Sequence, residues 1–384
     1  IYFSWREYGG AVSKLEMQKW YFNGTCPFVS DFTLVGNADN LSHASLHLLS
    51  TGNLLYMFSA TVDYMNVMGT AVISPEFDLL TTPQILTDPT SFWYTGLISV
   101  GTSSSGGALV IWDAFGDYVS EDRMMKVGNL GQKLWPGHRT VERQGGPPLR
   151  YYAEFTKNSG GNGGFSFSWT DNRAGDYHAF GSEYTAPRQP NQVARQFDSD
   201  RRILATKSAQ AQDGTIAGLY VSRNAESVSL EVMWCTQNFA PLWTDAATVA
   251  DIPFDISLTG LDIDIDSRGR AILSWAQNGS GSDQGVFFQA VTPDRQLVHA
   301  APVRADSGML AAQFRLTSIE PVGDGDAIVS WVDNAVGDFH VLAQRIGSNG
   351  SHVWPSLLQV TTIAPNSIST NELLALDDHM VAVY

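Results

Sequence analysis

An aromatic residue ends a short apolar segment at near-constant intervals along this chain of 384 residues. Typical segments read "ALVIW", "AILSW" and "AIVSW". The steps between the aromatics are 53, 54, 57, 51, 55, 56 and 53 residues. Regular self-similarity at this period indicates a repeat architecture. The aromatics are Trp5, Phe58, Trp112, Trp169, Tyr220, Trp275, Trp331 and Tyr384.

Each repeat predicts four antiparallel strands. Turns rich in Gly, Asp and Asn, such as "STGN", "QDGT" and "GDGD", join a first strand to the second strand that carries the aromatic. A polar turn, often with an Asp and an aromatic as in "GDYH" and "GDFH", leads to a third strand. A further turn with Gly or Pro leads to a short fourth strand.

A four-stranded repeat of about 54 residues is typical of a β-propeller blade. Tandem β-sandwiches would repeat near ~100 residues, and a parallel β-helix would have shorter coils without paired hairpin turns. We therefore predict an all-β fold, with residues 1–384 forming a single propeller domain of four-stranded antiparallel blades. Seven blades are favoured, with eight as the alternative.

The two ends of the chain bear on ring closure. Residues 371–384, "NELLALDDHMVAVY", supply a first and a second strand, and residues 1–22 supply a second, third and fourth. We expect N- and C-terminal strands to share a blade and close the ring. One second strand, 1–5 or 379–384, is then surplus; it lies outside the blade, for example on another molecule, or the ring has eight blades. Since both ends fall inside strands, we expect a processed or trimmed chain.

Charge limits the partners. There are 23 Lys and Arg against 39 Asp and Glu, a formal net charge of −16. This balance argues against binding the nucleic-acid phosphate backbone or anionic lipid. No apolar run approaches the length of a membrane-spanning helix, so membrane insertion is not expected.

The two cysteines, Cys26 and Cys235, fit neither a disulfide-dense scaffold nor a zinc knuckle. They fall in the first and fifth repeats, on opposite sides of a propeller, so we expect no disulfide between them. Four N-x-S/T sequons are consistent with an exported protein. They begin at Asn23, Asn40, Asn278 and Asn349.

Two repeats, at residues 169–176 and 331–354, resemble those of exported bacterial β-propeller repeat proteins. In that family a strand ending in Trp is followed by D-x-R-x-G-x-x-D, then Q-R, a Gly turn and a further Trp. The first half is matched, apart from spacing, by Trp169, Asp171, Arg173, Gly175 and Asp176. Most of the pattern is matched by Trp331, Asp333, Gly337, Asp338, Gln344, Arg345, Gly350 and Trp354. The resemblance implies an extracellular or cell-surface propeller and carries no single activity.

The recurring residues are interpreted first as parts of the fold. The aromatics are expected to fill the space between blades. The turn aspartates Asp63, Asp117, Asp176 and Asp338 are expected to accept backbone N–H groups in their own turns, the alternative being that they bind sugar hydroxyls or cations. His178 and His340 hold equivalent positions, which indicates repeat descent.

The segment "LDIDIDSRGR" places Asp262, Asp264 and Asp266 on one strand face. It lacks the Gly and Glu of an EF-hand loop. These three are the candidate metal ligands, although a solvent-exposed hairpin is the expected outcome. No zinc-binding, nucleophile-elbow or phosphate-binding motif is present. No catalytic residue and no cofactor are assigned from the sequence.

Two functions of different classes remain, and the sequence favours the first. The first is a non-catalytic extracellular propeller that binds a protein or glycan partner, acts in adhesion, or assembles with itself through a terminal strand. The second is a carbohydrate-active propeller enzyme, a glycosidase or lyase, with unrepeated carboxylates at the central channel. For the second, the most irregular repeat, residues 149–206 with the Arg-rich "ARQFDSDRRI", is the expected source.

Overall fold

The computed structural model describes residues 2–9, 12–19, 32–38, 40–62, 65–75, 78–87, 94–102, 106–115, 120–140, 151–155, 164–171, 176–185, 195–198, 202–224, 226–279, 283–308, 313–334, 339–360, 372–376 and 379–383. All extended regular structure in these ranges is β-strand. Among them, no helix has the length and apolarity needed to cross a membrane. The chain forms two compact units, one of 1–144, 161–165 and 376–384, the other of 145–160 and 166–375.

The first unit contains two four-stranded antiparallel blades, in the orders β4-β5-β6-β7 and β8-β9-β10-β11. Their strands are β4 (Asn40–Leu48), β5 (Leu54–Val62), β6 (Met65–Ile73), β7 (Gln84–Ile85), β8 (Tyr94–Thr102), β9 (Ala108–Phe115), β10 (Ser120–Val127) and β11 (Arg139–Thr140).

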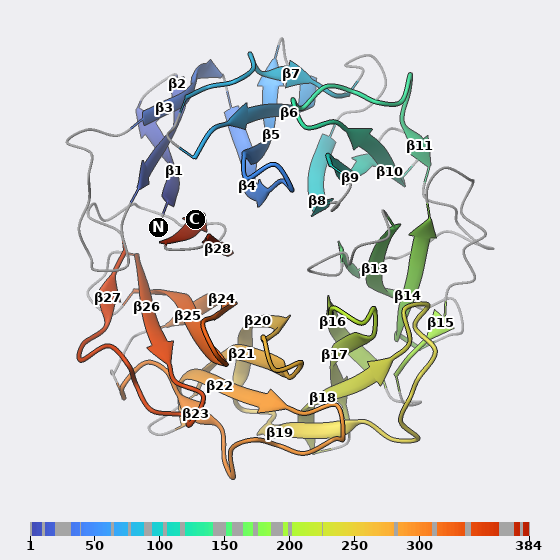
Figure 1. The fold of residues 1–384 in the computed structure, drawn as a ribbon, viewed down its shortest axis with the longest axis vertical. Coiled ribbons are helices and arrows are strands. Elements are labelled where there is room, and N and C mark those ends of the chain that lie inside the picture. The colour runs from blue at the N-terminus through green and yellow to red at the C-terminus, as the bar shows by residue number, and fades with distance from the viewer. Residues whose placement is uncertain are drawn as a thin grey trace. The chain divides into compact units, whose positions relative to one another are not determined.

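Four more four-stranded blades, each in chain order, fall largely in the second unit. Their strands are β12 (Tyr151–Phe155), β13 (Gly164–Asp171), β14 (His178–Thr185), β15 (Arg195–Gln196), β16 (Arg202–Gln210), β17 (Ile216–Arg223), β18 (Ser227–Cys235), β19 (Ala247–Pro253), β20 (Ser257–Ile265), β21 (Ala271–Asn278), β22 (Gly285–Val291), β23 (Val303–Arg304), β24 (Phe314–Val322), β25 (Asp326–Asp333), β26 (His340–Ile346) and β27 (Leu358–Gln359). Within this unit β16, β20 and β24 lie at corresponding edges of neighbouring blades (Figure 1).

Strands from both chain ends share one further sheet. It contains β1 (Tyr2–Gly9), β2 (Val12–Lys19), β3 (Phe32–Ala38), β28 (Glu372–Leu376) and β29 (His379–Val383), in the order β28-β29-β1-β2-β3. β1 pairs in parallel with β29, Phe3 opposite Ala382, and antiparallel with β2. The surplus second strand is therefore a fifth strand inside the sheet, where both of its edges are hydrogen-bonded. The expectation of seven four-stranded blades is corrected to six, beside this five-stranded sheet.

These sheets are the blades of an all-β propeller fold. Assignment of residues 1–384 to a single domain stays a prediction. The predicted strand ends are too early, since β9 continues to Phe115 beyond Trp112 and β21 to Asn278 beyond Trp275. The reason is that the residues after each aromatic still pair with the third strand of the blade.

The repeated aromatics fill the space between blades, as predicted. In the described side chains each exposes 3% of its surface or less: Phe58, Trp112, Trp169, Tyr220, Trp275 and Trp331. Trp331 packs in one cluster with Ile272 and Val286 of the preceding blade. Trp112 packs likewise with Leu55 and Met68.

The turn between third and fourth strands has a residue of positive φ at one fixed position. It is Gly131 and Gly350 in two blades, with φ of 71° and 83°, which suits glycine. In two others it is Phe239 and Arg295, with φ of 61° and 70°. Each of these side chains contacts the preceding blade: Phe239 packs on Phe197, and Arg295 donates to the carbonyl of Ala246. Contact between blades thus offsets the backbone strain.

Candidate functional site

The first strands of six blades carry residues at an equivalent register position. Five members lie 13 residues before the repeated aromatic: Ser45, Ser99, Lys207, Asp262 and Ser318. Register places each of the five opposite the residue that precedes the aromatic, as with Asp262 and Ser274. Glu154 of β12 has the same register, opposite Ser168, although its turn is longer. We call these six residues the inner row.

Charge in the inner row is confined to three consecutive blades. Glu154, Lys207 and Asp262 lie on β12, β16 and β20, whereas the other three positions hold serine. β12 contacts β16, and β16 contacts β20. Two acidic positions therefore flank one lysine on adjacent first strands.

Asp262 is the anchor of this row. Its side chain is almost fully buried, and its Oδ1 lies 3.6 Å from the Lys207 Nζ. Its Oδ2 accepts the backbone N–H of Ile319 at 2.9 Å and the hydroxyl of Ser318 at 3.3 Å, both from β24. These donors and Lys207 hold the carboxylate in one position between β16 and β24. Lys207 keeps 27% of its side chain exposed, so it is accessible to a ligand while Asp262 is not.

The expectation that Asp262, Asp264 and Asp266 are solvent-exposed is wrong. They expose 3%, 2% and 4% of their surface. β20 is packed between β16 and β24, so the alternation that was read as a solvated face points into contacts between strands. Asp264 Oδ1 accepts the N–H of Ile265 at 2.7 Å.

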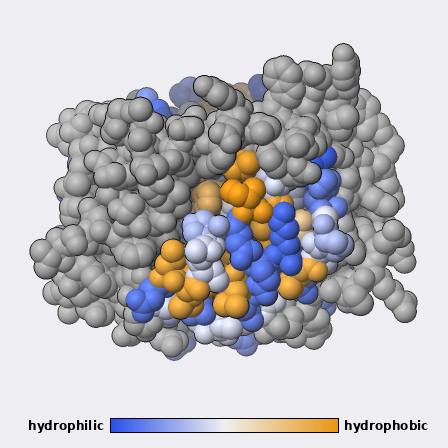
Figure 2. Space-filling model, turned by 90° about the horizontal axis from the view of Figure 1, so that it is seen from above, coloured by the Kyte–Doolittle hydropathy of each residue, from blue (hydrophilic) through white to orange (hydrophobic). Residues whose placement is uncertain are grey.

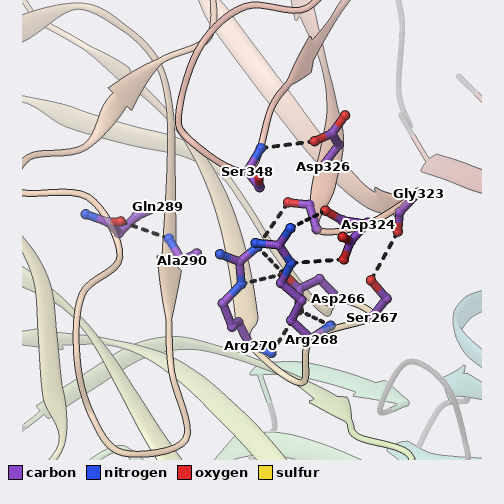
Figure 3. A network of polar contacts seen from close by, with 11 residues as sticks. Asp266, Ser267, Arg268, Arg270, Gln289, Ala290, Gly323, Asp324, Asp326 and Ser348 are labelled. Carbon is purple, nitrogen blue, oxygen red and sulfur yellow. Dashed lines mark hydrogen bonds and ion pairs between the residues drawn. The ribbon is translucent and has the colours of Figure 1, made fainter.

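Asp266 belongs to a network that joins two neighbouring hairpin turns (Figure 3). Its carboxylate accepts the backbone N–H groups of Arg268 and Arg270 and the guanidinium of Arg270. Arg270 also donates to the carbonyl of Gly325 at 3.0 Å, and Arg268 pairs with Asp324 at 3.0 Å. Every group drawn here has a protein partner, so we assign the network to blade–blade attachment. Within the described residues, no group of three His, Cys, Asp or Glu could hold a metal ion.

Of the turn aspartates, only Asp176 lies in the described part, where it is exposed. Asp63, Asp117 and Asp338 lie outside the described residues. Their proposed roles in turns or ligand binding stay predictions.

The two histidines are equivalent, as predicted. His178 opens β14 and contacts Gln196 at 3.0 Å, and His340 opens β26 and contacts Gln359 at 3.3 Å. His178 alone also pairs with Asp198, at 3.0 Å.

Asp198 is a buried carboxyl group at a repeated position. Burial raises its pKa, and the hydrogen bond from His178 partly opposes this rise. Asp198 directly follows Phe197, whose backbone N–H donates to a carbonyl of the third strand. The buried Thr87 and Asp306 hold the same position in two other blades. Thr87 accepts a backbone N–H and Asp306 accepts Arg304. Recurrence of a buried acceptor at this position indicates a structural role.

The motif residues behind the family resemblance also serve the fold. Gln344 donates to the carbonyl of Trp354 at 3.4 Å, and the equivalent Gln289 donates to that of His299 at 2.9 Å. Arg345 makes two contacts with Asp326. These bonds fasten the third strand to the following turns. Cys235 is free and buried, and Cys26 lies outside the described residues.

Lys207 and Glu154 were not recognised from the sequence. The signal that would have found Lys207 is the fixed offset of 13 residues from the aromatic, at which a serine is replaced by a charge. Figure 2 shows hydrophilic and hydrophobic residues interspersed over the described part of one face.

Comparisons with known proteins show likeness at the level of fold. No family model matches this chain, and no curated protein matches it in sequence. Among solved structures, the polysaccharide lyase Uly1 is similar with a TM-score of 0.56 and 11% identity, over 89% of this chain and 86% of that one. A protein of unknown function from Dyadobacter fermentans is similar with a TM-score of 0.51 and 9% identity, over 79% and 94%. A thermostable family-43 glycoside hydrolase gives a TM-score of only 0.41 at 14% identity, over 73% and 99%, too low to support a conclusion.

Proposed function

We propose that this propeller is a carbohydrate-active enzyme that cleaves a polysaccharide at the charged part of the inner row. The observation that carries the proposal is the replacement of serine by Glu154, Lys207 and Asp262 on three adjacent first strands. Fold likeness to a polysaccharide lyase supports it. No comparison supports the non-catalytic reading that the sequence first favoured.

Cleavage of a glycosidic bond needs groups that move protons, and a pair of carboxylates is the usual set for hydrolysis. In this site Lys207 is the group that contacts substrate, because its side chain is partly exposed. Asp262 is a positioning residue: it is buried and holds the lysine from one side. Glu154 holds the second acidic position of the row by its register opposite Ser168. The ammonium of Lys207 beside Asp262 suits donation of a proton to the leaving group or stabilisation of developing negative charge.

The test is a screen of neutral and acidic polysaccharides with the full chain. Release of reducing ends measures cleavage by either reaction, and ultraviolet absorbance of an unsaturated sugar distinguishes elimination from hydrolysis. Lys207→Gln is expected to lower kcat at least ~100-fold, the usual contribution of a proton-transferring group. Ser45→Ala, at the equivalent position of another blade, is the matched control and should retain activity. Cleavage unchanged by Lys207→Gln would exclude this site.

We also propose that the five-stranded sheet closes the ring of blades. Pairing of β1 with β29 supports this. Removal of residues 379–384 should then expose the edge of β1 and lower Tm. An unchanged Tm would contradict closure by this sheet.

A further inference from the structure

Two arginines face each other across strands at one end of the fifth repeat. Arg202 begins β16 and Arg223 ends β17, and the two are direct partners in the antiparallel register. Both are exposed. Like charges directly opposite each other destabilise a sheet, so this pair needs a physical reason.

The pair breaks the pattern of the repeat. The equivalent partners in three other blades are uncharged: Asn40 with Thr61, Tyr94 with Phe115, and Ser257 with Asn278. Repeat descent therefore does not account for two arginines here. Arg202 belongs to the Arg-rich segment "ARQFDSDRRI" of the most irregular repeat, residues 149–206.

Each guanidinium lies over an aromatic ring. Arg202 Cζ is 5.8 Å from the centre of the Tyr177 ring, and Arg223 Cζ is 4.8 Å from that of Phe254. Phe254 is 43% exposed. Stacking of this kind holds a guanidinium in place and leaves its N–H donors free for a planar anion.

No carboxylate neutralises this pair within the described residues. Asp176 and Asp255, next in sequence to the two rings, are exposed and form no ion pair with either arginine. Arginines near the hairpin turns and the turns after the third strands behave differently, since each has an aspartate partner. Those pairs are Arg268–Asp324, Arg270–Asp266, Arg295–Asp245 and Arg345–Asp326.

We propose that Arg202 and Arg223 bind the carboxylate or sulfate groups of an acidic polysaccharide. A guanidinium binds such groups through two parallel hydrogen bonds, and the exposed Phe254 ring offers a face on which a sugar can stack. An anion between the arginines would also remove their mutual repulsion. The choice of a polysaccharide rests on the proposed function.

The site lies on the same strand as the proposed catalytic lysine. A register irregularity lies between Arg202 and Lys207 on β16, and their partners Arg223 and Leu219 on β17 are four residues apart, which is about 13 Å at ~3.3 Å per residue. This separation places the arginines outside the reacting group's immediate surroundings. We therefore assign them to substrate binding.

Binding is tested by titration calorimetry of the full chain with polygalacturonate, dextran sulfate and neutral dextran. We expect binding of at least one anionic polymer, weakened by salt, and none of dextran. Polygalacturonate alone would identify carboxylate as the group, and dextran sulfate alone would identify sulfate. The variant Arg202→Gln/Arg223→Gln should bind about 10-fold more weakly for each arginine lost. Arg268→Gln, which removes an arginine already paired with Asp324, is the matched control and should bind as the parent does.

Folding is checked on the same variants. Loss of like-charge repulsion predicts that the double glutamine variant has a Tm no lower than the parent. The double lysine variant keeps both charges but not the planar donors, so it should bind with intermediate affinity. A lower Tm for the glutamine variant would mean that the arginines are structural and would overturn the proposal. So would unchanged affinity, or a DNA duplex that binds as tightly as the polysaccharide through the same arginines.

The outcome separates this site from the proposed catalysis. Arginine-dependent binding without cleavage of any polysaccharide would support the anion site and refute the catalytic function. Cleavage that depends on Lys207 but shows an unchanged KM in the double glutamine variant would support the catalytic function and refute the anion site.

Discussion

Phe239 and Gly181 provide a direct test of how neighbouring blades hold together. Phe239 has positive φ and is fully buried, with its ring over β14 and against Phe197, 5.4 Å between ring centres. A Cβ built on Gly181 would lie 2.1 Å from Phe239 Cδ1. The Phe239 ring therefore occupies the space that a side chain at residue 181 would need.

The two single substitutions should each destabilise the protein. Gly181→Ala forces the ring against its neighbours, an overpacking cost of about 1–3 kcal/mol. Phe239→Gly loses a buried phenyl group, a cost of about 3–5 kcal/mol. Relief of the left-handed backbone returns about 1–2 kcal/mol, so the net loss is about 1–4 kcal/mol.

The double variant gives the decisive value. Once the ring is gone the new methyl group has room, so Gly181→Ala should cost less than ~0.5 kcal/mol in the Phe239→Gly background. The coupling free energy is then about 1–3 kcal/mol. Urea unfolding followed by far-ultraviolet circular dichroism measures all four corners of the cycle. Gly137→Ala, where an added Cβ meets nothing within 4 Å, is the control and should stay within ~0.5 kcal/mol of the parent. Additive losses would show that the ring does not occupy this space, and would refute the reasoning.

Three further predictions concern buried titratable groups. Burial raises the pKa of Cys235 to about 12, so iodoacetamide should leave this thiol unmodified at pH 8 until the protein unfolds. Mass spectrometry measures the labelling, and rapid labelling of the native protein would contradict the burial of Cys235. Burial lowers the pKa of His47 from 6.5 to about 3, so only the unfolded state takes up this proton as pH falls from 6.5 to 3. The free energy of unfolding should drop across that window by at most about 1.4 kcal/mol per pH unit, and an acid Tm profile that His47→Gln leaves unaltered would argue against the assignment. Asp266→Asn leaves the buried guanidinium of Arg270 without its partner at 2.6 Å, so we expect a loss of about 3–5 kcal/mol in urea unfolding; a loss below ~1 kcal/mol would mean that the pair contributes little.

The sequence by itself determined the blade. The near-equal steps between aromatics, together with the Gly- and Asp-rich turns, predicted blades of four antiparallel strands. They also predicted that the repeated aromatic side chain is buried, and Trp112 and Trp331 are buried as expected. This was possible because the hairpins form from residues close in sequence, and because each repeat reports the same local preference again. Strand ends were predicted less well, since pairing with the third strand continues past the aromatic.

Tertiary structure decided the features that depend on neighbouring blades. Alternation in "LDIDID" is the same for a solvated strand and for one packed between β16 and β24, so the burial of Asp262 could not be read from its own segment. The parallel pairing of Phe3 with Ala382 joins residues from opposite ends of the chain, which no local pattern records. The charged inner row and the facing Arg202 and Arg223 emerged only when register aligned the repeats. The physical reason is that partners distant in sequence set the surroundings of a side chain, and those surroundings determine whether a charge is exposed, paired or available to a ligand.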